Sequence, residues 1–317
     1  MQVRKLAPIL LGLVLVLSAC GRGTATPPNT PGTSKGSFPV TLKDDDGVVV
    51  TMRTAPRRII TFAPSNTEIV FALGLGSRLV GVSGKFDNYP PAARSIPSVG
   101  GSGQFGVDPN IERVVALHPD LMLTISGGDE WKKRLRDLGI AVFTINATDF
   151  EDLLHDIRTV GEIIGASRQA AALTAQMAAK AAKIRATASL EPAVSCFFEA
   201  YYPPLTTVGP RTFIFDLLKR AGCDPVSSGA KSDYPEWSID QLVAGSPKVY
   251  LVASESGVSP DQVAMRPGFR AIAAVSSNHV FLVNSDLVSR PGPRVVEGLL
   301  ALARFLHPQY FLCVASC

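Results

Sequence analysis

The sequence predicts an α/β protein with two similar lobes, each built on a mainly parallel central sheet, joined by one long α-helix. Three observations support this fold class. A block of sequence occurs twice, strand-like apolar runs alternate with helix-like segments, and an alanine-rich stretch lies between the two copies. Alternating strands and helices favour parallel sheets, because a connection between parallel strands usually contains a helix.

The repeat relates residues 111–126 (IERVVALHPDLMLTIS) to residues 239–254 (IDQLVAGSPKVYLVAS) without a gap, at an offset of 128. Each copy is typical of a short helix, a proline break and an apolar strand. Two further similarities follow in the same order, between 142–146 and 280–284 and, more loosely, between the helix starts at 67–71 and 212–216. One arrangement of strands and helices is therefore used twice.

The segment between the copies, residues 167–189, is rich in alanine with interspersed lysine and arginine and contains neither glycine nor proline. This composition strongly favours a helix. Gly165 ends the preceding helix, and Pro192 closes the segment. About 23 residues at a rise of 1.5 Å give a rod of roughly 34 Å. We expect this rod to bridge the lobes; a surface helix of the first lobe is the alternative.

The composition is that of a globular protein. The chain has 317 residues, 46% apolar and 18% charged, which excludes a fully disordered chain, collagen and a coiled coil. The formal net charge is +4, from 31 basic and 27 acidic residues. Such a nearly neutral protein offers no electrostatic argument for nucleic-acid binding.

The N-terminus follows the plan of a signal peptide. Arg4 and Lys5 precede an apolar run of about 13 residues, where a membrane-spanning helix would need about 20. The sequence Leu-Ser-Ala-Cys that ends at Cys20 resembles the bacterial lipobox, in which the cysteine is lipidated and becomes the mature N-terminus. An ordinary secretory signal with an incidental cysteine is the alternative. We expect an exported protein, lipid-anchored to the outer face of the cell membrane or in the periplasm.

The predicted organisation has six parts. They are a signal peptide (1–19), the lipidated cysteine with a flexible tether poor in apolar residues (20–37), an N-terminal α/β lobe (38–165), the bridging helix (166–190), a C-terminal α/β lobe (191–309) and a tail (310–317).

Four further cysteines remain, at 196, 223, 313 and 317. Export permits disulfides, but four cysteines allow three full pairings and the sequence does not choose among them. No CxxC pair is present, which argues against a structural zinc site.

Enzyme motifs are missing from the sequence. It contains no GxSxG elbow, no HExxH pair and no phosphate-binding GxxxxGK[ST] loop. Residues 101–106 match GxGxxG, but no convincing strand precedes them, so we interpret them as a loop of the cleft. The four histidines lack the spacing of metal ligands, and His307 is expected to interact with the C-terminus of its own helix. No catalytic residue, metal site or resident cofactor is predicted.

Ligand-binding residues are expected beyond the carboxyl ends of the parallel strands. In the first lobe, residues 58–63 are typical of a strand, and the segment from Ser65 to Glu68 matches a capping box at the start of the next helix. Loops at predicted strand ends carry large aromatic side chains, arginines and acids. Such groups suit a sizeable organic ligand, although simple packing is the alternative role for each aromatic ring.

Six stretches of this chain resemble the substrate-binding proteins of ABC importers for vitamin B12, haem and iron-siderophores. They are PRRIITFAPSNTEIVFALGLGSRLVGVS, DNYPPAA, IERVVALHPDLML, LGIAVFTIN, PPLTTVGPRTFIFDLLKRAGC and SRPGPRVVEGLLALARFLHP, and they cover about residues 56 to 307. The resemblance implies a class III solute-binding protein of the helical-backbone type. Such a monomer would hold a cobalamin, haem or ferric siderophore between its lobes, unaltered, and deliver it to a membrane permease and its ATPase. The cobalt or iron would belong to the ligand. An exported enzyme or sensor that reuses the scaffold is the alternative.

The resemblance also implies roles for individual residues. Glu112 matches the acid of the first lobe that docks against permease arginines, and Asp240 stands where the second lobe usually has glutamate. A helix N-terminus that favours an acid is the alternative explanation for both. Phe86, Tyr234 and Asp286 fall near cleft positions of the B12 binders, whereas the glycine-rich loop 100–106, with Phe105, replaces a tryptophan.

Other polar and aromatic residues suit a haem or siderophore complex, and Tyr201 could bind haem iron as a tyrosinate. The full predicted ligand-binding set is Phe86, Phe105, Glu199, Tyr201, Tyr234, Trp237, Asp286 and Arg290.

Overall fold

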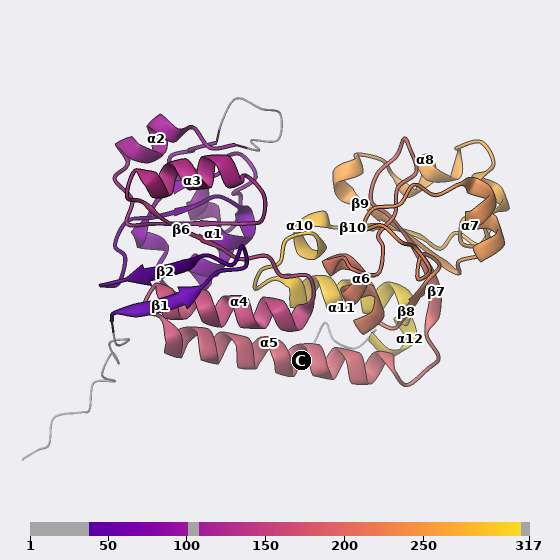
Figure 1. Cartoon of the computed structure of the whole chain (residues 1–317). Coiled ribbons are helices and arrows are strands. Elements are labelled where there is room, and N and C mark those ends of the chain that lie inside the picture. Colours follow the sequence, from indigo (N-terminus) through magenta and orange to yellow (C-terminus); the bar gives the residue numbers. More distant parts are fainter. Residues whose placement is uncertain (1–37, 101–107, 312–317) are drawn as a thin grey trace, which may run out of the picture. The chain divides into compact units, whose positions relative to one another are not determined.

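The structure is a computed structural model that describes residues 38–100 and 108–311 (Figure 1). These residues belong to one compact unit. Their strands form two four-stranded parallel sheets and one antiparallel hairpin. The strands are β1 (Val40–Lys43), β2 (Val49–Met52), β3 (Ile59–Thr61), β4 (Leu79–Val82), β5 (Leu121–Thr124), β6 (Ala141–Thr144), β7 (Val194–Glu199), β8 (Cys223–Pro225), β9 (Val249–Ala253) and β10 (Val280–Val283).

The two parallel sheets have the same topology. The N-terminal sheet has the order β4-β3-β5-β6, and the C-terminal sheet has the order β8-β7-β9-β10. In each lobe the first strand of the sheet therefore lies between the second and the third, and the fourth follows the third. All the pairings within these sheets are parallel. The predicted fold class, two similar α/β lobes with parallel sheets, is confirmed.

The repeat extends to the backbone conformation. The two copies form helices α2 (Ile111–Ala116) and α7 (Ile239–Gly245), each followed by a strand of the respective sheet. His118 and Ser246 occupy equivalent positions after these helices and have φ angles of 44° and 42°. Left-handed backbone is uncommon for residues other than glycine, so its occurrence at both positions indicates a common local structure.

The remaining helices surround the sheets. They are α1 (Pro64–Ala72), α3 (Asp129–Asp137), α4 (Phe150–Ile163), α5 (Ser167–Ala188), α6 (Phe213–Arg220), α8 (Pro260–Ala264), α9 (Ala273–Ser276), α10 (Ser285–Val288), α11 (Val295–Leu306) and α12 (Pro308–Phe311), with short 3-10 turns at Gly76–Arg78, Pro91–Ser95, Ser254–Ser256 and Phe269–Ala271. Over the two described ranges of the chain, no helix has both the length and the hydropathy that a membrane crossing needs.

Helix α5 contacts helices of both lobes (Figure 1). It packs along α4 of the N-terminal lobe and against α6 and α11 of the C-terminal lobe. Gly161 permits the close approach of α4 and α5, because a Cβ at this position would lie 2.3 Å from the Cβ of Ala170. The alanine-rich segment is therefore the long helix that joins the lobes, as the sequence predicts.

Each sheet buries both of its faces. In β5, Leu121 and Leu123 join one apolar cluster while Met122 joins another, and in β9 Leu251 and Tyr250 divide in the same way. The first of these clusters also contains residues of α4, α5, α6 and α11 and extends through both lobes, so we call it the shared core. The other face of each sheet packs against a cluster of its own lobe. Burial on both faces explains the nearly continuous apolar runs of the strands.

One pairing of the cysteines lies within the described residues. Cys196 on β7 and Cys223 on β8 form a disulfide, and both side chains are buried. The bond links neighbouring strands of the C-terminal sheet. Cys313 and Cys317 lie outside the described residues.

Candidate ligand-binding site

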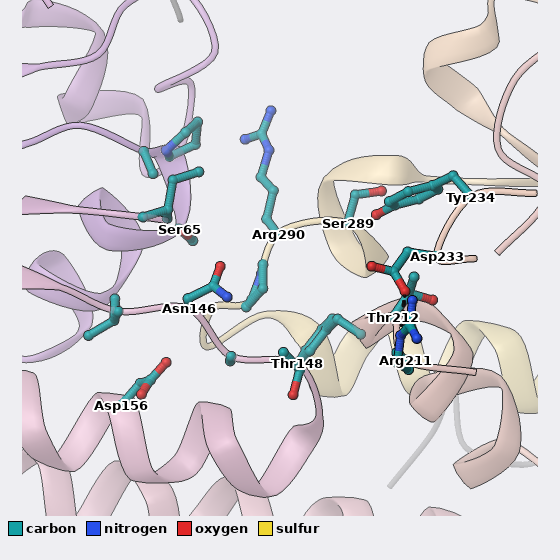
Figure 2. A pocket seen from close by; sticks show the side chains of 17 residues that line it. Ser65, Asn146, Thr148, Asp156, Arg211, Thr212, Asp233, Tyr234, Ser289 and Arg290 are labelled. Carbon is teal, nitrogen blue, oxygen red and sulfur yellow. Dashed lines mark hydrogen bonds and ion pairs between the residues drawn. The ribbon is translucent and has the colours of Figure 1, made fainter. Parts of the chain in front are cut away.

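A cavity of about 440 Å³ is lined by residues of both lobes (Figure 2). The N-terminal lobe contributes the segments that follow β3, β5 and β6, together with Asp156 from α4. The C-terminal lobe contributes residues 211–213, 233–234 and 289–291. The cavity therefore lies beyond the carboxyl ends of the N-terminal sheet, where open parallel sheets bind ligands. We call it the inter-lobe cavity.

A second cavity of about 290 Å³ adjoins the first and shares Ala63, Pro64 and Ile125 with it. Aromatic rings line this second cavity. The Phe86 ring is 45% exposed, and Trp131 packs edge-on against Phe62 with ring centroids 5.5 Å apart. Exposed rings at a concave surface supply flat apolar area for an organic ligand.

Charged and phenolic groups line the inter-lobe cavity from the C-terminal lobe. Arg211 forms an ion pair of 2.9 Å with Asp233, and both side chains are largely exposed. Tyr234 is 60% exposed, and desolvation together with the nearby carboxylates of Asp233 and Glu255 raises the pKa of its phenol. The hydroxyl therefore remains a hydrogen-bond donor at neutral pH.

A set of polar contacts connects the lobes beside the cavity, and we call it the inter-lobe bridge. Arg294 donates to both carboxylate oxygens of Glu68, at 2.9 and 2.6 Å. Arg290 lies 3.9 Å from the same carboxylate and pairs with Asp286 at 2.6 Å. Asn88 accepts from Arg290 at 3.0 Å and donates to Asp286 at 3.1 Å. The hydrogen bond to Glu68 raises the pKa of Arg294.

The inter-lobe bridge explains why the predicted capping box is wrong. Helix α1 begins at Pro64 after the N-cap residue Ala63, and no side chain caps this end. Glu68 is only 3% exposed and directs its carboxylate to Arg294 of the other lobe. Arg294 gives this carboxylate two charge-assisted hydrogen bonds, whereas a capping box would give it one.

The predicted ligand-binding residues differ in their places. Phe86 lines the second cavity, Tyr234 and Arg290 line the inter-lobe cavity, and Asp286 belongs to the inter-lobe bridge. Phe105 and the proposed lipidation site Cys20 lie outside the described residues.

Glu199 is a structural group in this arrangement and does not line either cavity. Its side chain is fully buried and accepts two hydrogen bonds from Arg266, at 2.6 and 3.0 Å. The hydroxyl of Tyr250 donates to the same carboxylate. Burial, together with the adjacent Glu199 carboxylate, raises the pKa of this phenol. All of these contacts lie within the C-terminal lobe, so the acid is committed to a buried pair.

Tyr201 and Trp237 also lie outside the residues that line the two cavities. Tyr201 is 56% exposed and forms an isolated bridge with Thr206. Trp237 packs against Phe197 with ring centroids 6.5 Å apart and belongs to the apolar cluster of the C-terminal lobe. Packing accounts for Trp237, whereas Tyr201 is an exposed ring of a loop.

Glu112 and Asp240 occupy equivalent, exposed positions. Each is the second residue of its helix, α2 or α7. Separate side chains cap these helices, because Asn110 and Ser238 accept hydrogen bonds from the third residue of the respective helix. The two acids are therefore available for external contacts.

Residues 38–100 and 108–311 contain no group of three or more His, Cys, Asp or Glu side chains placed to hold a metal ion. His307 ends α11, and its ring contacts the carbonyl oxygen of Gly222 at 3.2 Å. This contact joins the ring to the turn after α6, and the expected interaction of His307 with the C-terminus of its own helix stays a prediction.

Several cavity residues are missing from the predicted ligand-binding set, notably Trp131, Arg211 and Asp156. Arg211 lies just before α6, in the segment that connects β7 to this helix. Ligands of parallel sheets bind at such connections, so the position of Arg211 in the sequence was a usable signal. Asp156 carried another signal, since it interrupts the apolar face that Leu153 and Val160 continue. A carboxyl group on the buried face of a helix is rare without a partner or a function.

Two lobes on a common long helix, with a cavity lined from both sides, define a two-lobed solute-binding protein. The family model for periplasmic binding proteins matches residues 59–287, and the chain belongs to this family. The family functions outside the cytoplasm, so the protein is exported. The family and the relatives described below are binding proteins by name, not enzymes.

The relatives cover most of the chain. An uncharacterized ABC transporter substrate-binding lipoprotein of Bacillus subtilis is 32% identical over 319 residues, 96% of this chain and 97% of the relative. A cobalamin-binding protein of Halobacterium salinarum is 32% identical over 289 residues, 86% of this chain and 75% of the relative. The crystal structure of the periplasmic vitamin B12 binding protein of Vibrio cholerae superposes with a TM-score of 0.70 at 22% identity, covering 80% and 97% of the two chains, and shows the common fold.

Proposed function

We propose that this protein is the substrate-binding component of an ABC importer that captures cobalamin and delivers it, unaltered, to a membrane permease and its ATPase. Haem and ferric siderophores are the alternative ligands. The observation that carries the proposal is the inter-lobe cavity together with the adjoining cavity, because aromatic rings from both lobes and arginines from the C-terminal lobe line them. The names of the Halobacterium and Bacillus relatives support the ligand and the transport system.

The two kinds of side chain have complementary uses. Phe86, Trp131 and Tyr234 offer flat faces to a large ring system. Arg211 and Arg290 offer cationic groups that pair with phosphate or carboxylate groups of a ligand. Cavities of roughly 300–1,000 Å³ with a few such polar groups are typical of small-molecule sites.

Capture requires little movement of the lobes. The shared core extends through both lobes, and α5 packs against helices of each. The inter-lobe bridge adds a buried carboxylate–guanidinium pair across the same boundary. We therefore expect a modest hinge motion on binding rather than a wide opening and closing.

Calorimetric titration with cyanocobalamin, haemin and a ferric hydroxamate siderophore tests the ligand. We expect the double variant Phe86→Ala/Tyr234→Ala to bind its ligand at least about fivefold more weakly, because each lost ring contact is worth roughly 0.5–1.5 kcal/mol. Tyr310→Ala, which removes a ring 36% exposed at the end of the described chain, is the matched control. Failure of all three ligands to bind would overturn the proposal. Tyr201→Phe tests a tyrosinate bond to iron and matters only if haemin binds.

Docking to the permease is proposed to use Glu112 and Asp240. The variant Glu112→Ala/Asp240→Ala is expected to bind ligand normally but to abolish uptake by whole cells. The matched control is Glu130→Ala/Asp261→Ala, which removes an exposed acid from the first turn of another helix in each lobe. Uptake at the normal rate in the first variant would refute the docking assignment.

Lipidation of Cys20 is proposed to anchor the protein, which acts as a monomer, to the membrane. Cys20→Ser is expected to release it into the soluble fraction of an exported preparation, while ligand affinity is unchanged. Retention of the variant in the membrane fraction after a carbonate wash would contradict the anchor.

A further inference from the structure

The floor of the inter-lobe cavity carries an acid that packing does not explain. Asp156 lies on α4 between Leu153 and Val160, on the face that packs into the shared core, and is only 4% exposed. It nevertheless lines the inter-lobe cavity. A carboxyl group in such a place needs partners, because water does not solvate it freely.

Only part of the hydrogen-bonding capacity of this carboxyl group is used within the protein. The backbone N–H of Ala147 donates to it, but Oδ2 has no hydrogen-bond partner among the described residues. Figure 2 shows the side chain rising from α4 toward the segment that carries Asn146 and Thr148, both of which line the same cavity. Buried polar atoms in folded proteins are nearly always paired, so an unpaired oxygen at the edge of a cavity indicates a missing partner.

The surroundings favour the uncharged form of Asp156. Burial, with the neighbouring carboxylates of Asp45 and Asp152, raises the pKa of Asp156 to about 8. At neutral pH the group is therefore mainly a carboxylic acid with one O–H donor and a carbonyl acceptor. The elements packed against α4 and the other cavity segments carry further charged or titratable side chains, namely Lys43 on β1, Arg168, Lys180, Lys183 and Arg185 on α5, Asp216, Lys219 and Arg220 on α6, and Arg211, Asp233, Tyr234 and Arg290 at the cavity.

We propose that Asp156 binds an uncharged carboxamide of the ligand through a reciprocal pair of hydrogen bonds at the floor of the inter-lobe cavity. The acid O–H donates to the amide oxygen, and the acid carbonyl accepts from the amide N–H. Asn146 and Thr148 provide further amide and hydroxyl groups beside it. This inference rests on the proposed function, since a corrin ring carries several carboxamide side chains around its edge.

The same geometry disfavours a carboxylate at this position. An anionic group would lie beside Asp156 and within the field of Asp45 and Asp152. The cations of the cavity, Arg211 and Arg290, come from the other lobe. The cavity thus binds neutral amide groups at Asp156 and anionic groups at the arginines of the C-terminal lobe. This arrangement favours a corrinoid, which carries many amide groups, over a haem, which carries two propionates.

The test measures the affinity of the full chain for cyanocobalamin between about pH 6 and pH 10. In the wild type we expect the affinity to fall about tenfold with a midpoint near pH 8, because ionisation removes one donated hydrogen bond. Asp156→Asn keeps a donor and an acceptor, so it should bind as the wild type does at pH 6 and lose the pH dependence. Asp156→Leu should bind, at every pH, about tenfold more weakly than the wild type binds at pH 6. Glu162→Gln, on the exposed side of α4, is the matched control.

The outcomes separate the two proposals. If Asp156→Asn keeps the pH dependence of the wild type, or if Asp156→Leu binds cyanocobalamin at pH 6 as tightly as the wild type does, the role of Asp156 is refuted while the proposed function stands. If the wild type does not bind cyanocobalamin at all, the cobalamin assignment fails and this inference fails with it. The Asn variant keeps the shape of the side chain, so its result does not depend on a disturbed fold.

Discussion

Replacing Glu68 with glutamine is expected to destabilise the protein by about 3 kcal/mol. The carboxylate is 3% exposed and accepts hydrogen bonds of 2.9 and 2.6 Å from Arg294, with Arg290 a further 3.9 Å away. Hydrogen bonds to charged groups contribute roughly 1.5–3 kcal/mol each, and breaking a buried pair by removing one partner costs about 3–5 kcal/mol. The arginine side chains are 13% and 15% exposed, so partial hydration places the loss at the lower end.

Urea unfolding at pH 7, followed by circular dichroism, measures this loss as a shift of the midpoint at an unchanged slope. The control is Asp137→Asn, which breaks an exposed ion pair with Lys133 of the same 2.6 Å length. That pair is 75% and 61% exposed, so its loss should cost less than about 0.5 kcal/mol. A cost below about 1 kcal/mol for Glu68→Gln would refute the reasoning that the inter-lobe bridge stabilises the lobes.

Three other changes have defined outcomes. Replacing Cys196 and Cys223 with alanine should lower the free energy of unfolding by about 3–4 kcal/mol, because the bond closes a loop of 27 residues; equal unfolding midpoints with and without the bond would contradict this. Asp156→Asn should raise the melting temperature increasingly as the pH rises from about 4 to 8, since the raised pKa makes ionisation destabilise the folded state; a pH-independent gain would argue against a raised pKa. Lys132→Met should lower the free energy of unfolding, measured in urea, by about 2–4 kcal/mol, because the buried ammonium donates to Asp46 at 2.6 Å. Adding Asp46→Asn should recover part of this loss, and no recovery would show that the ion pair does not account for it.

The repeated sequence predicts the topology of the sheets because the repeated segments are local. The alignment of 111–126 with 239–254 places a helix, a turn and a strand in each lobe, and both turns contain a left-handed residue, His118 or Ser246. The alanine-rich composition likewise identifies α5 because helix propensity acts through neighbouring residues. Features that arise within a single segment are therefore visible in the sequence.

Contacts between distant segments are not visible in this way. Glu68 satisfies a local capping pattern, yet its partner Arg294 lies 226 residues away. Glu199 is the last residue of β7, at a strand end where a ligand-binding acid is expected, but Arg266 and Tyr250 bind its carboxylate in the folded lobe. In both cases a guanidinium from another segment decides the role of the acid, and no local spacing indicates which arginine arrives.

The shared core has a consequence for the independence of the two halves. Apolar residues of α4, α5, α6 and α11 belong to one continuous cluster, so cutting the chain between the lobes would expose faces that are now covered. A fragment containing either half alone is expected to aggregate or to remain partly unfolded, because a large uncovered apolar patch is unfavourable in water. We therefore expect the two copies of the plan to unfold together, as a single cooperative body.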